Sequence, residues 1–168
     1  MFQKGDYIVY GSTGVCEVMD VTTVEMTGVE KDRLYYILHP YNDNGGRIFT
    51  PVDGKKTFMR KIISKEEAKQ LIHDIPNIEE LKAKNNKVRE EEYKECLKSC
   101  ECKEWIKIIK TAYLRKQRRQ AEGKKLTVLD MKYWKQAEDN LYSEFSVLFN
   151  IPKDKVEAYI AEQIHLLK

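Results

Sequence analysis

The chain has 168 residues, of which 34% are charged and 42% hydrophobic, and 30 basic and 27 acidic side chains give a formal net charge of +3. These proportions are typical of a soluble globular protein with one ordinary domain or two small ones. The apolar runs are too short for a transmembrane helix, and Lys4-Gly5-Asp6 interrupts any signal-peptide core. We therefore expect a cytoplasmic protein with no membrane segment.

Residues 1–62 are predicted to form β-strands. A turn at Gly5-Asp6 and a second turn over residues 11–14 flank a short run of β-forming residues, and a new strand begins at Val15. Further strands are expected at 34–38, at 47–50 after a turn over residues 42–46 that includes Asn44, and within 57–62. Short strands around tight glycine turns predict a small β-barrel of the Tudor or SH3 type.

Residues 63–168 are predicted to form an all-helical domain, so that the fold class is α+β. A capping box at Ser64-Lys65-Glu66-Glu67 begins the first helix, and Pro76-Asn77 interrupts it. Ile78 and Leu81 suggest one or two more turns, and residues 84–87 resemble a linker. Helical periodicity predicts further helices at about 88–100, 102–120 and 127–149, and a last one with the apolar stripe Val156, Ile160, Ile164 and Leu167. The pattern Thr127-x-x-Asp130 is predicted to cap the helix at 127–149.

The apolar stripes of the middle three helices predict the helical core. The inward-facing residues are Tyr93, Cys96, Leu97 and Cys100, then Trp105, Ile106, Ile108, Ile109, Ala112 and Tyr113, and finally Met131, Trp134, Ala137, Leu141, Phe145 and Leu148. Both tryptophans fall in these stripes, so we interpret them as core residues.

The cysteines and histidines do not predict a metal site or a catalytic site. Cys96, Cys100 and Cys102 have no fourth ligand beside them, and only a distant residue such as His73 could complete a zinc site. Buried thiols are the favoured interpretation of these residues and of Cys16. The histidines are scattered and no phosphate-binding loop is present, so we predict no cofactor and no enzyme activity.

Positive charge is concentrated in one segment. Residues 103–135 carry eleven basic and three acidic side chains, a net charge of +8, whereas residues 1–60 carry −1. Such a segment favours binding to nucleic acid or another polyanion. The alternative is a solvated helix end whose cations complement the helix dipole. The predicted basic stripe contains Lys103, Lys107, Lys110, Leu114 and Arg118, widened by Arg115, Lys116 and Arg119 and followed by Lys124 and Lys125.

The sequence resembles the CarD/CdnL/TRCF family of bacterial RNA polymerase-binding proteins. The resemblance rests on Gly5-Asp6 through Tyr10, on Gly14-Val15, on residues 34–38 and on residues 47–51. Weaker matches in the helical half are Tyr93-Lys94 before Leu97-Lys98, and Leu126-Thr127 at a helix start. The resemblance implies a Tudor-like RNA polymerase interaction domain at 1–62 and a helical DNA-binding domain at 63–168.

The family resemblance also implies two interfaces. The β-domain would dock on the β subunit of RNA polymerase through an exposed strand edge, which carries over to Ile37, Phe49 and Pro51, with Arg47 beside them. The helical domain would contact promoter double-stranded DNA near the upstream edge of the melted region and stabilise the open complex. We expect the contacts to be independent of sequence, because phosphates carry no base information.

One departure from the family pattern concerns the DNA interface. Arg89 stands where the family commonly has a tryptophan wedge, and Glu90-Glu91-Glu92 replace a basic pair and would repel phosphates. The expected DNA contacts are therefore Lys87, Arg89 and Lys94, together with Lys107, Lys110, Arg115, Lys116, Arg118, Arg119, Lys124 and Lys125.

The sequence thus predicts a non-enzymatic transcriptional regulator that acts as a monomer and binds RNA polymerase and promoter DNA. The alternative is a polymerase-binding or other protein-binding module with little or no DNA binding.

Overall fold

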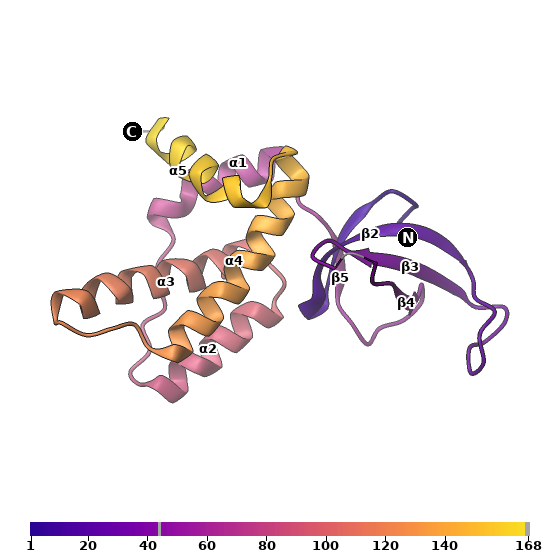
Figure 1. Ribbon diagram of the computed structural model, residues 1–168, viewed down its shortest axis with the longest axis horizontal. Helices are drawn as coiled ribbons and strands as arrows, with labels where there is room; N and C mark the ends of the chain where they lie inside the picture. The colour runs from indigo at the N-terminus through magenta and orange to yellow at the C-terminus, as the bar shows by residue number, and fades with distance from the viewer. Residues whose placement is uncertain (44, 167–168) are drawn as a thin grey trace. The chain divides into compact units, whose positions relative to one another are not determined.

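The computed structural model describes residues 1–43 and 45–166. The chain divides into two compact units, Met1–Ile62 and Ile63–Lys168. The first unit is an antiparallel sheet and the second is helical, which confirms the predicted α+β class (Figure 1). The predicted turn residue Asn44 and stripe residue Leu167 lie outside the described residues.

The sheet of the first unit has the strand order β4-β3-β2-β1-β5, and each neighbouring pair is antiparallel. Gly14 begins β2 with a φ of 88°, a conformation that favours glycine and lets the chain reverse after β1. The strands are β1 (Tyr7–Tyr10), β2 (Gly14–Thr23), β3 (Leu34–Pro40), β4 (Ile48–Pro51) and β5 (Met59–Lys61), with the 3-10 turn η1 (Gly11–Thr13) between β1 and β2.

The main hydrophobic cluster of the first unit lies on one face of this sheet, whereas the buried Val9 and Val15 lie on the other. Buried side chains alternate along the strands, as Tyr36 and Leu38 do in β3, because successive residues of a strand point to opposite faces. The cluster consists of Ile8, Cys16, Val18, Tyr36 and Leu38. Ile37 and Phe49 therefore lie on the opposite face of β3 and β4.

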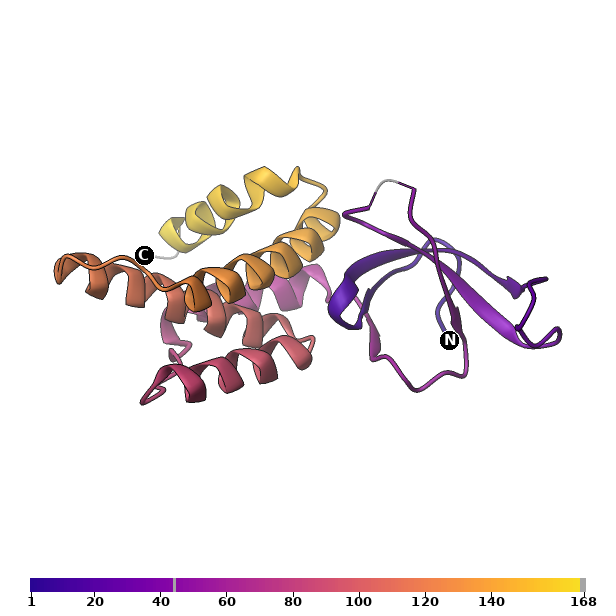
Figure 2. The ribbon, with the colours of Figure 1, turned by 60° about the horizontal axis from the view of Figure 1, so that its bottom comes forward.

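The helices of the second unit begin at the predicted caps. The Ser64 hydroxyl accepts a hydrogen bond from the Glu67 amide at 3.1 Å, and the Thr127 hydroxyl accepts one from the Asp130 amide at 3.1 Å. The helices are α1 (Lys65–Asp74), α2 (Asn86–Lys98), α3 (Cys102–Ala121), α4 (Val128–Phe149) and α5 (Val156–Leu166), with 3-10 turns η2 (Ile75–Asn77) and η3 (Lys153–Lys155). Helix α4 is central, because it contacts α1, α2, α3 and α5 (Figure 2).

The segment between η2 and α2 differs from the prediction. The expected helical turns at Ile78 and Leu81 were wrong, because the Leu81 amide donates to the Thr111 hydroxyl at 2.8 Å instead of to a carbonyl of the preceding turn. Upstream, Lys110 Nζ donates to the Ile75 carbonyl at 2.8 Å. These two contacts hold the segment against α3. Asn85 belongs to no linker but caps α2, since its side chain accepts from the Val88 amide at 2.9 Å.

The helical core matches the predicted stripes except near two helix ends. Tyr93, Trp105 and Phe145 are among the largest fully buried side chains. Tyr113 and Met131 were predicted to face inward but are exposed, whereas Thr111 and Tyr133 are buried. Both misplaced residues lie where α3 and α4 extend toward the turn that joins them. Trp134 is only half-buried, and its Nε1 donates to Glu138 at 2.6 Å.

The four cysteines are buried, and none of them forms a disulfide. Burial raises the pKa of the Cys16 thiol to about 11. Burial, and then a hydrogen bond to Glu104, raises the pKa of Cys96 to about 12. Within the described residues, no group of three or more His, Cys, Asp or Glu side chains is placed to hold a metal ion. No described helix combines the length and hydropathy that crossing a membrane requires.

Candidate functional site

The residues predicted to bind RNA polymerase gather at the edge of the sheet, on the edge strand β4, just before it and on the neighbouring β3. Ile37 lies directly opposite Phe49, and Tyr35 lies directly opposite Pro51. Directly opposed residues of antiparallel strands place their side chains on the same face, so these four form one apolar patch. Phe49 is 42% exposed, while Ile37 and Pro51 are half-buried. Arg47 is exposed immediately before β4.

The backbone of β4 is also open on its outer side. The Val52 amide donates to the Leu34 carbonyl at 3.0 Å, which places Ile48, Thr50 and Val52 at the hydrogen-bonded positions toward β3. The intervening Phe49 then directs its N–H and C=O away from the sheet. An edge with this pattern can pair with a strand from another protein.

A surface ion pair lies at the far end of this strand pair. Arg33, just before β3, donates to Asp53, just after β4, at 2.9 Å. The hydrogen bond from Arg33 lowers the pKa of the Asp53 carboxyl. The apolar patch is thus flanked by Arg47 at one end of β4 and by the Arg33–Asp53 pair at the other.

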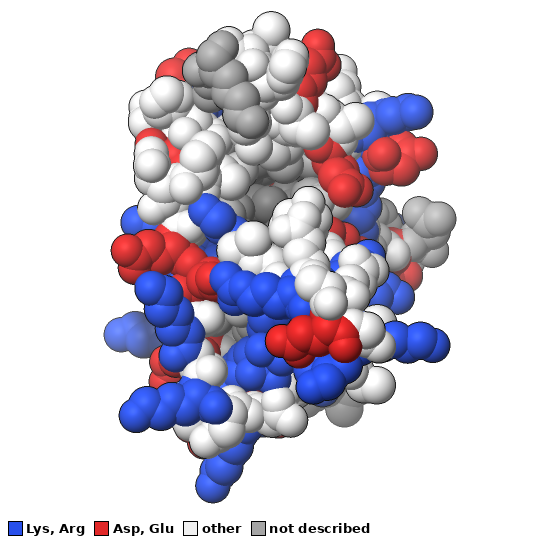
Figure 3. Space-filling model, turned by 90° about the vertical axis from the view of Figure 1, so that its left-hand side faces the viewer, with Lys and Arg blue, Asp and Glu red and all other residues white. Residues whose placement is uncertain are grey.

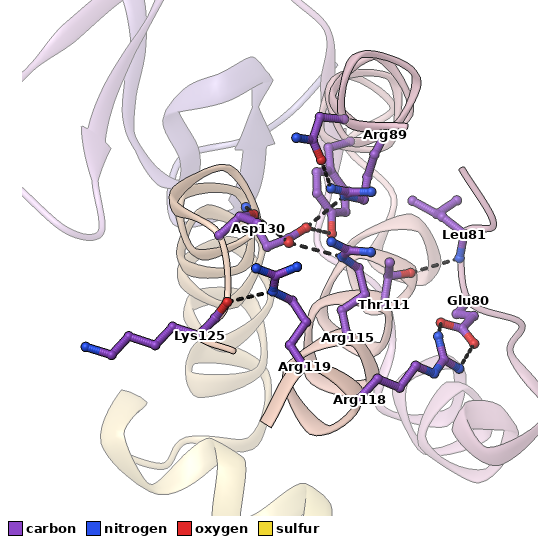
Figure 4. A network of polar contacts seen from close by, with 12 residues as sticks. Glu80, Leu81, Arg89, Thr111, Arg115, Arg118, Arg119, Lys125 and Asp130 are labelled. Atoms are coloured by element: carbon purple, nitrogen blue, oxygen red, sulfur yellow. Dashed lines mark hydrogen bonds and ion pairs between the residues drawn. The ribbon is translucent and has the colours of Figure 1, made fainter. Parts of the chain in front are cut away.

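In the helical unit, the predicted DNA contacts Arg89 and Arg115 converge on Asp130 instead (Figure 4). Arg89 Nε lies 3.0 Å from one carboxylate oxygen, and Arg115 Nε lies 3.0 Å from the other. The hydroxyls of Tyr93 and Thr127 donate to the same carboxylate at 2.8 and 2.6 Å. The network joins α2, α3 and the start of α4.

Burial and hydrogen bonding shift the pKa of Asp130 in opposite directions. Burial raises the pKa of its carboxyl, but hydrogen bonds from Thr127, Tyr93 and Arg115 lower it, and the net shift is downward. Asp130 is therefore a buried carboxylate that two arginines neutralise. The side chain of Arg89 is only 4% exposed. Its guanidinium is largely enclosed by its own unit, so little of it is accessible for the expected DNA contact.

Most of the other predicted DNA contacts also have partners within the helical unit. Arg118 forms an ion pair with Glu80, which is largely buried. Arg119 Nε donates to the Lys125 carbonyl at 2.6 Å. The lysines also have partners. These are Glu90 for Lys94 (3.4 Å), Glu104 for Lys107 (3.0 Å), the Ile75 carbonyl for Lys110 (2.8 Å), Glu122 for Lys124 (3.8 Å) and the Trp134 ring for Lys116 (5.7 Å from Nζ to the ring centre).

Exposed cations remain around the turn that joins α3 and α4. Lys116, Arg118, Lys124 and Lys125 are exposed there, and Lys87 is exposed at the start of α2. Figure 3 shows lysine and arginine side chains outnumbering acidic ones on the side of the molecule where this turn lies. The structure thus supports a basic surface that is smaller than the sequence predicts.

The acidic run on α2 does not form one exposed face. Glu90 pairs with Lys94, and Glu92 is half-buried with one enclosed carboxylate oxygen. Only Glu91 is fully exposed. Consecutive helical residues point in directions about 100° apart, so the three carboxylates cannot all face the same DNA surface.

The comparisons with known proteins concern the first unit. The family model that matches is the CarD-like/TRCF RID domain, and the match covers residues 2–63. Residues 2–63 are a CarD-like/TRCF RID domain. RID domains interact with RNA polymerase. The comparison with curated proteins gives no match. The family resemblance predicted from the sequence is thus confirmed for the β-unit.

Proposed function

We propose that this protein is a transcriptional regulator whose β4 edge docks on the β subunit of RNA polymerase. The observation that carries the proposal is an exposed apolar strand edge within a polymerase-interacting domain. The partner would add a strand beside β4 and receive hydrogen bonds from the outward backbone of Phe49. Ile37, Phe49 and Pro51 would form the apolar contact, and Arg47 would lie at its rim.

Of the residues at this interface, Phe49 is expected to contribute most to the free energy of binding. It is exposed in the free protein, and burying it fully would contribute roughly 1.5–3 kcal/mol. Truncating it leaves the core unchanged, because the core cluster lies on the other face of the sheet.

Phe49→Ala, tested for binding to the purified β subunit, examines the proposal directly. Phe58→Ala is a matched control, since Phe58 is 54% exposed and lies just before β5 at the opposite edge. We expect Phe49→Ala to weaken binding about tenfold or more and Phe58→Ala to leave it unchanged. Equal affinities of folded Phe49→Ala and wild-type protein would exclude the β4 edge from the interface.

For the helical unit, we propose contact with the promoter DNA backbone near the melted region, where it would stabilise the open complex. The support is the group of exposed cations at the α3–α4 turn: Lys116, Arg118, Lys124 and Lys125. Contacts of this kind are independent of sequence and fall off with salt.

A second candidate function is a polymerase-binding module with little or no DNA binding. It is favoured by the internal pairing of the arginines, because Arg89 and Arg115 neutralise Asp130 and Arg118 pairs with Glu80. Measuring DNA binding at low salt separates the two candidates.

A further inference from the structure

A surface pocket of the helical unit is lined by basic side chains from three parts of the chain. Its volume is about 400 Å³, and it lies between α3, the start of α2 and the segment before α2. The charged residues that line it are Lys82, Lys84, Arg89, Arg115, Arg118 and Glu80. With Asp130 behind Arg89 and Arg115, five positive and two negative groups give this pocket a net charge of +3.

The walls of the pocket are held in place by their own contacts. Arg115 and Arg118 lie three residues apart on one face of α3. The opposing segment is fixed to α3 by the hydrogen bond between the Leu81 amide and Thr111. Asp130 orients Arg89 and Arg115 through their Nε atoms (Figure 4). Arg89 and Arg115 are thus preorganised, so these two side chains lose little freedom when a ligand binds.

Some hydrogen-bond donors of these arginines are not used by the described residues. Arg115 donates through Nε to Asp130, and no hydrogen bond from its two terminal nitrogens is found within residues 1–43 and 45–166. Helix α2 begins directly after the pocket residue Lys84, so the positive end of its dipole adds to the field. The planar guanidinium of Arg115 can therefore offer its two terminal nitrogens to phosphate oxygens, whose geometry they match.

Glu80 supplies a carboxylate where an anion would approach. Both terminal nitrogens of Arg118 donate to the Glu80 carboxylate, which is largely buried. A carboxylate paired in this way competes with an incoming anion for the same donors. The negative charge of Glu80 is therefore expected to lower the affinity of the pocket for an anion.

We propose that this pocket is a phosphate-binding site. The phosphate group comes either from a nucleic-acid backbone or from a free phosphorylated small molecule, and both present the same oxygens to Arg115, Arg118 and Lys84. The site shares Arg118 with the proposed contact between the α3–α4 turn and DNA, whereas Lys84 and Arg115 belong to the pocket and not to the cations proposed for the turn.

The test uses the full chain and NMR titration with inorganic pyrophosphate in a phosphate-free buffer. We expect saturable shifts in the signals of pocket residues. Arg118→Gln should weaken pyrophosphate binding about tenfold, as expected for loss of charge-assisted hydrogen bonds. Lys124→Gln is the matched control, because Lys124 and Arg118 are both 60% exposed and both pair with a glutamate.

Glu80→Gln gives a second measurement with the opposite sign. Removing the competing carboxylate should tighten pyrophosphate binding, whereas Glu122→Gln, which removes the partner of Lys124, should leave it unchanged. Absence of saturable shifts, or equal effects of Arg118→Gln and Lys124→Gln in folded protein, would overturn the proposal.

Adding a DNA duplex to the pyrophosphate-loaded protein identifies the source of the phosphate. Displacement of pyrophosphate by DNA, with a larger loss of DNA affinity in Arg118→Gln than in Lys124→Gln, assigns the site to a nucleic-acid backbone. Retention of pyrophosphate in the presence of DNA assigns it to a free phosphorylated molecule.

Discussion

The β4 edge and the basic segment 103–135 differ in how much of their chemistry remains available to a partner. On β4, the apolar side chain of Phe49 is exposed and its backbone N–H points away from the sheet. In the basic segment, Arg115 and Arg118 are held by carboxylates of their own unit. A count of charges in the sequence therefore overstates a binding surface, and the partners of each side chain decide what is left.

The largest effect is expected from Asp130→Ala, which tests whether the internal pairs are structural. The substitution leaves Arg89 buried without its counter-charge, so the free energy of unfolding should fall by about 3–5 kcal/mol. Chemical denaturation of the full chain measures it. Glu122→Ala, at an exposed pair, should change it by less than about 1 kcal/mol. If Asp130→Ala lowered the free energy of unfolding no more than Glu122→Ala does, Arg89 would need no counter-charge.

A related effect is expected at low pH. The pKa of Asp130 is lowered in the folded state from its ordinary value of 3.8, so its stabilising contribution is complete above that value. It is lost as the pH falls through the depressed folded-state pKa. Denaturation midpoints between pH 5 and pH 2 should therefore fall more steeply for the wild type than for Asp130→Asn. Parallel curves for the two proteins would remove Asp130 from the acid transition.

A smaller effect is expected for DNA binding, which tests how many cations of the basic segment remain free. If the four cations at the α3–α4 turn contact phosphates, log K should fall with log salt at a slope of about −3 to −4. Replacing Lys124 and Lys125 with Gln should reduce the slope by about 2. Fluorescence anisotropy with a labelled duplex measures both.

The matched control replaces Lys55 and Lys56, two consecutive exposed lysines of the β-unit, with Gln. It should leave the slope unchanged. An equal reduction by both double variants would indicate non-specific attraction, and no binding at low salt would favour the module without DNA binding.

The smallest effect is expected from metal removal. The cysteine thiols are buried and pack as small apolar groups, so circular dichroism of the full chain should not change after strong chelation. Loss of helical signal that returns with added zinc would contradict this expectation.

The sequence predicted the elements whose signals are local. Ser64 and Thr127 were recognised as helix caps because a cap needs only its own first turn. The β4 edge could be located because Phe49 and Pro51 resemble the family motif. Asp130 was interpreted only as part of the capping pattern Thr127-x-x-Asp130, since its ion pairs come from residues 41 and 15 positions away. No local pattern reveals such a partner.

Arg89 is the clearest example of this limit. Its position in the family pattern suggested a DNA contact, and only the packing of α2 against α4 shows that Asp130 neutralises it. Glu80 was missed for the same reason, because its partner Arg118 lies 38 residues away.

Hydrogen–deuterium exchange of the full chain, with and without the purified β subunit, tests the central claim most directly. The outward amide of Phe49 should exchange quickly in the free protein and become protected in the complex, when a carbonyl of the partner strand accepts its hydrogen bond. We predict that the peptide covering residues 48–52 shows the largest gain in protection. Unchanged exchange in that peptide, with protection appearing at β5 instead, would contradict docking through β4.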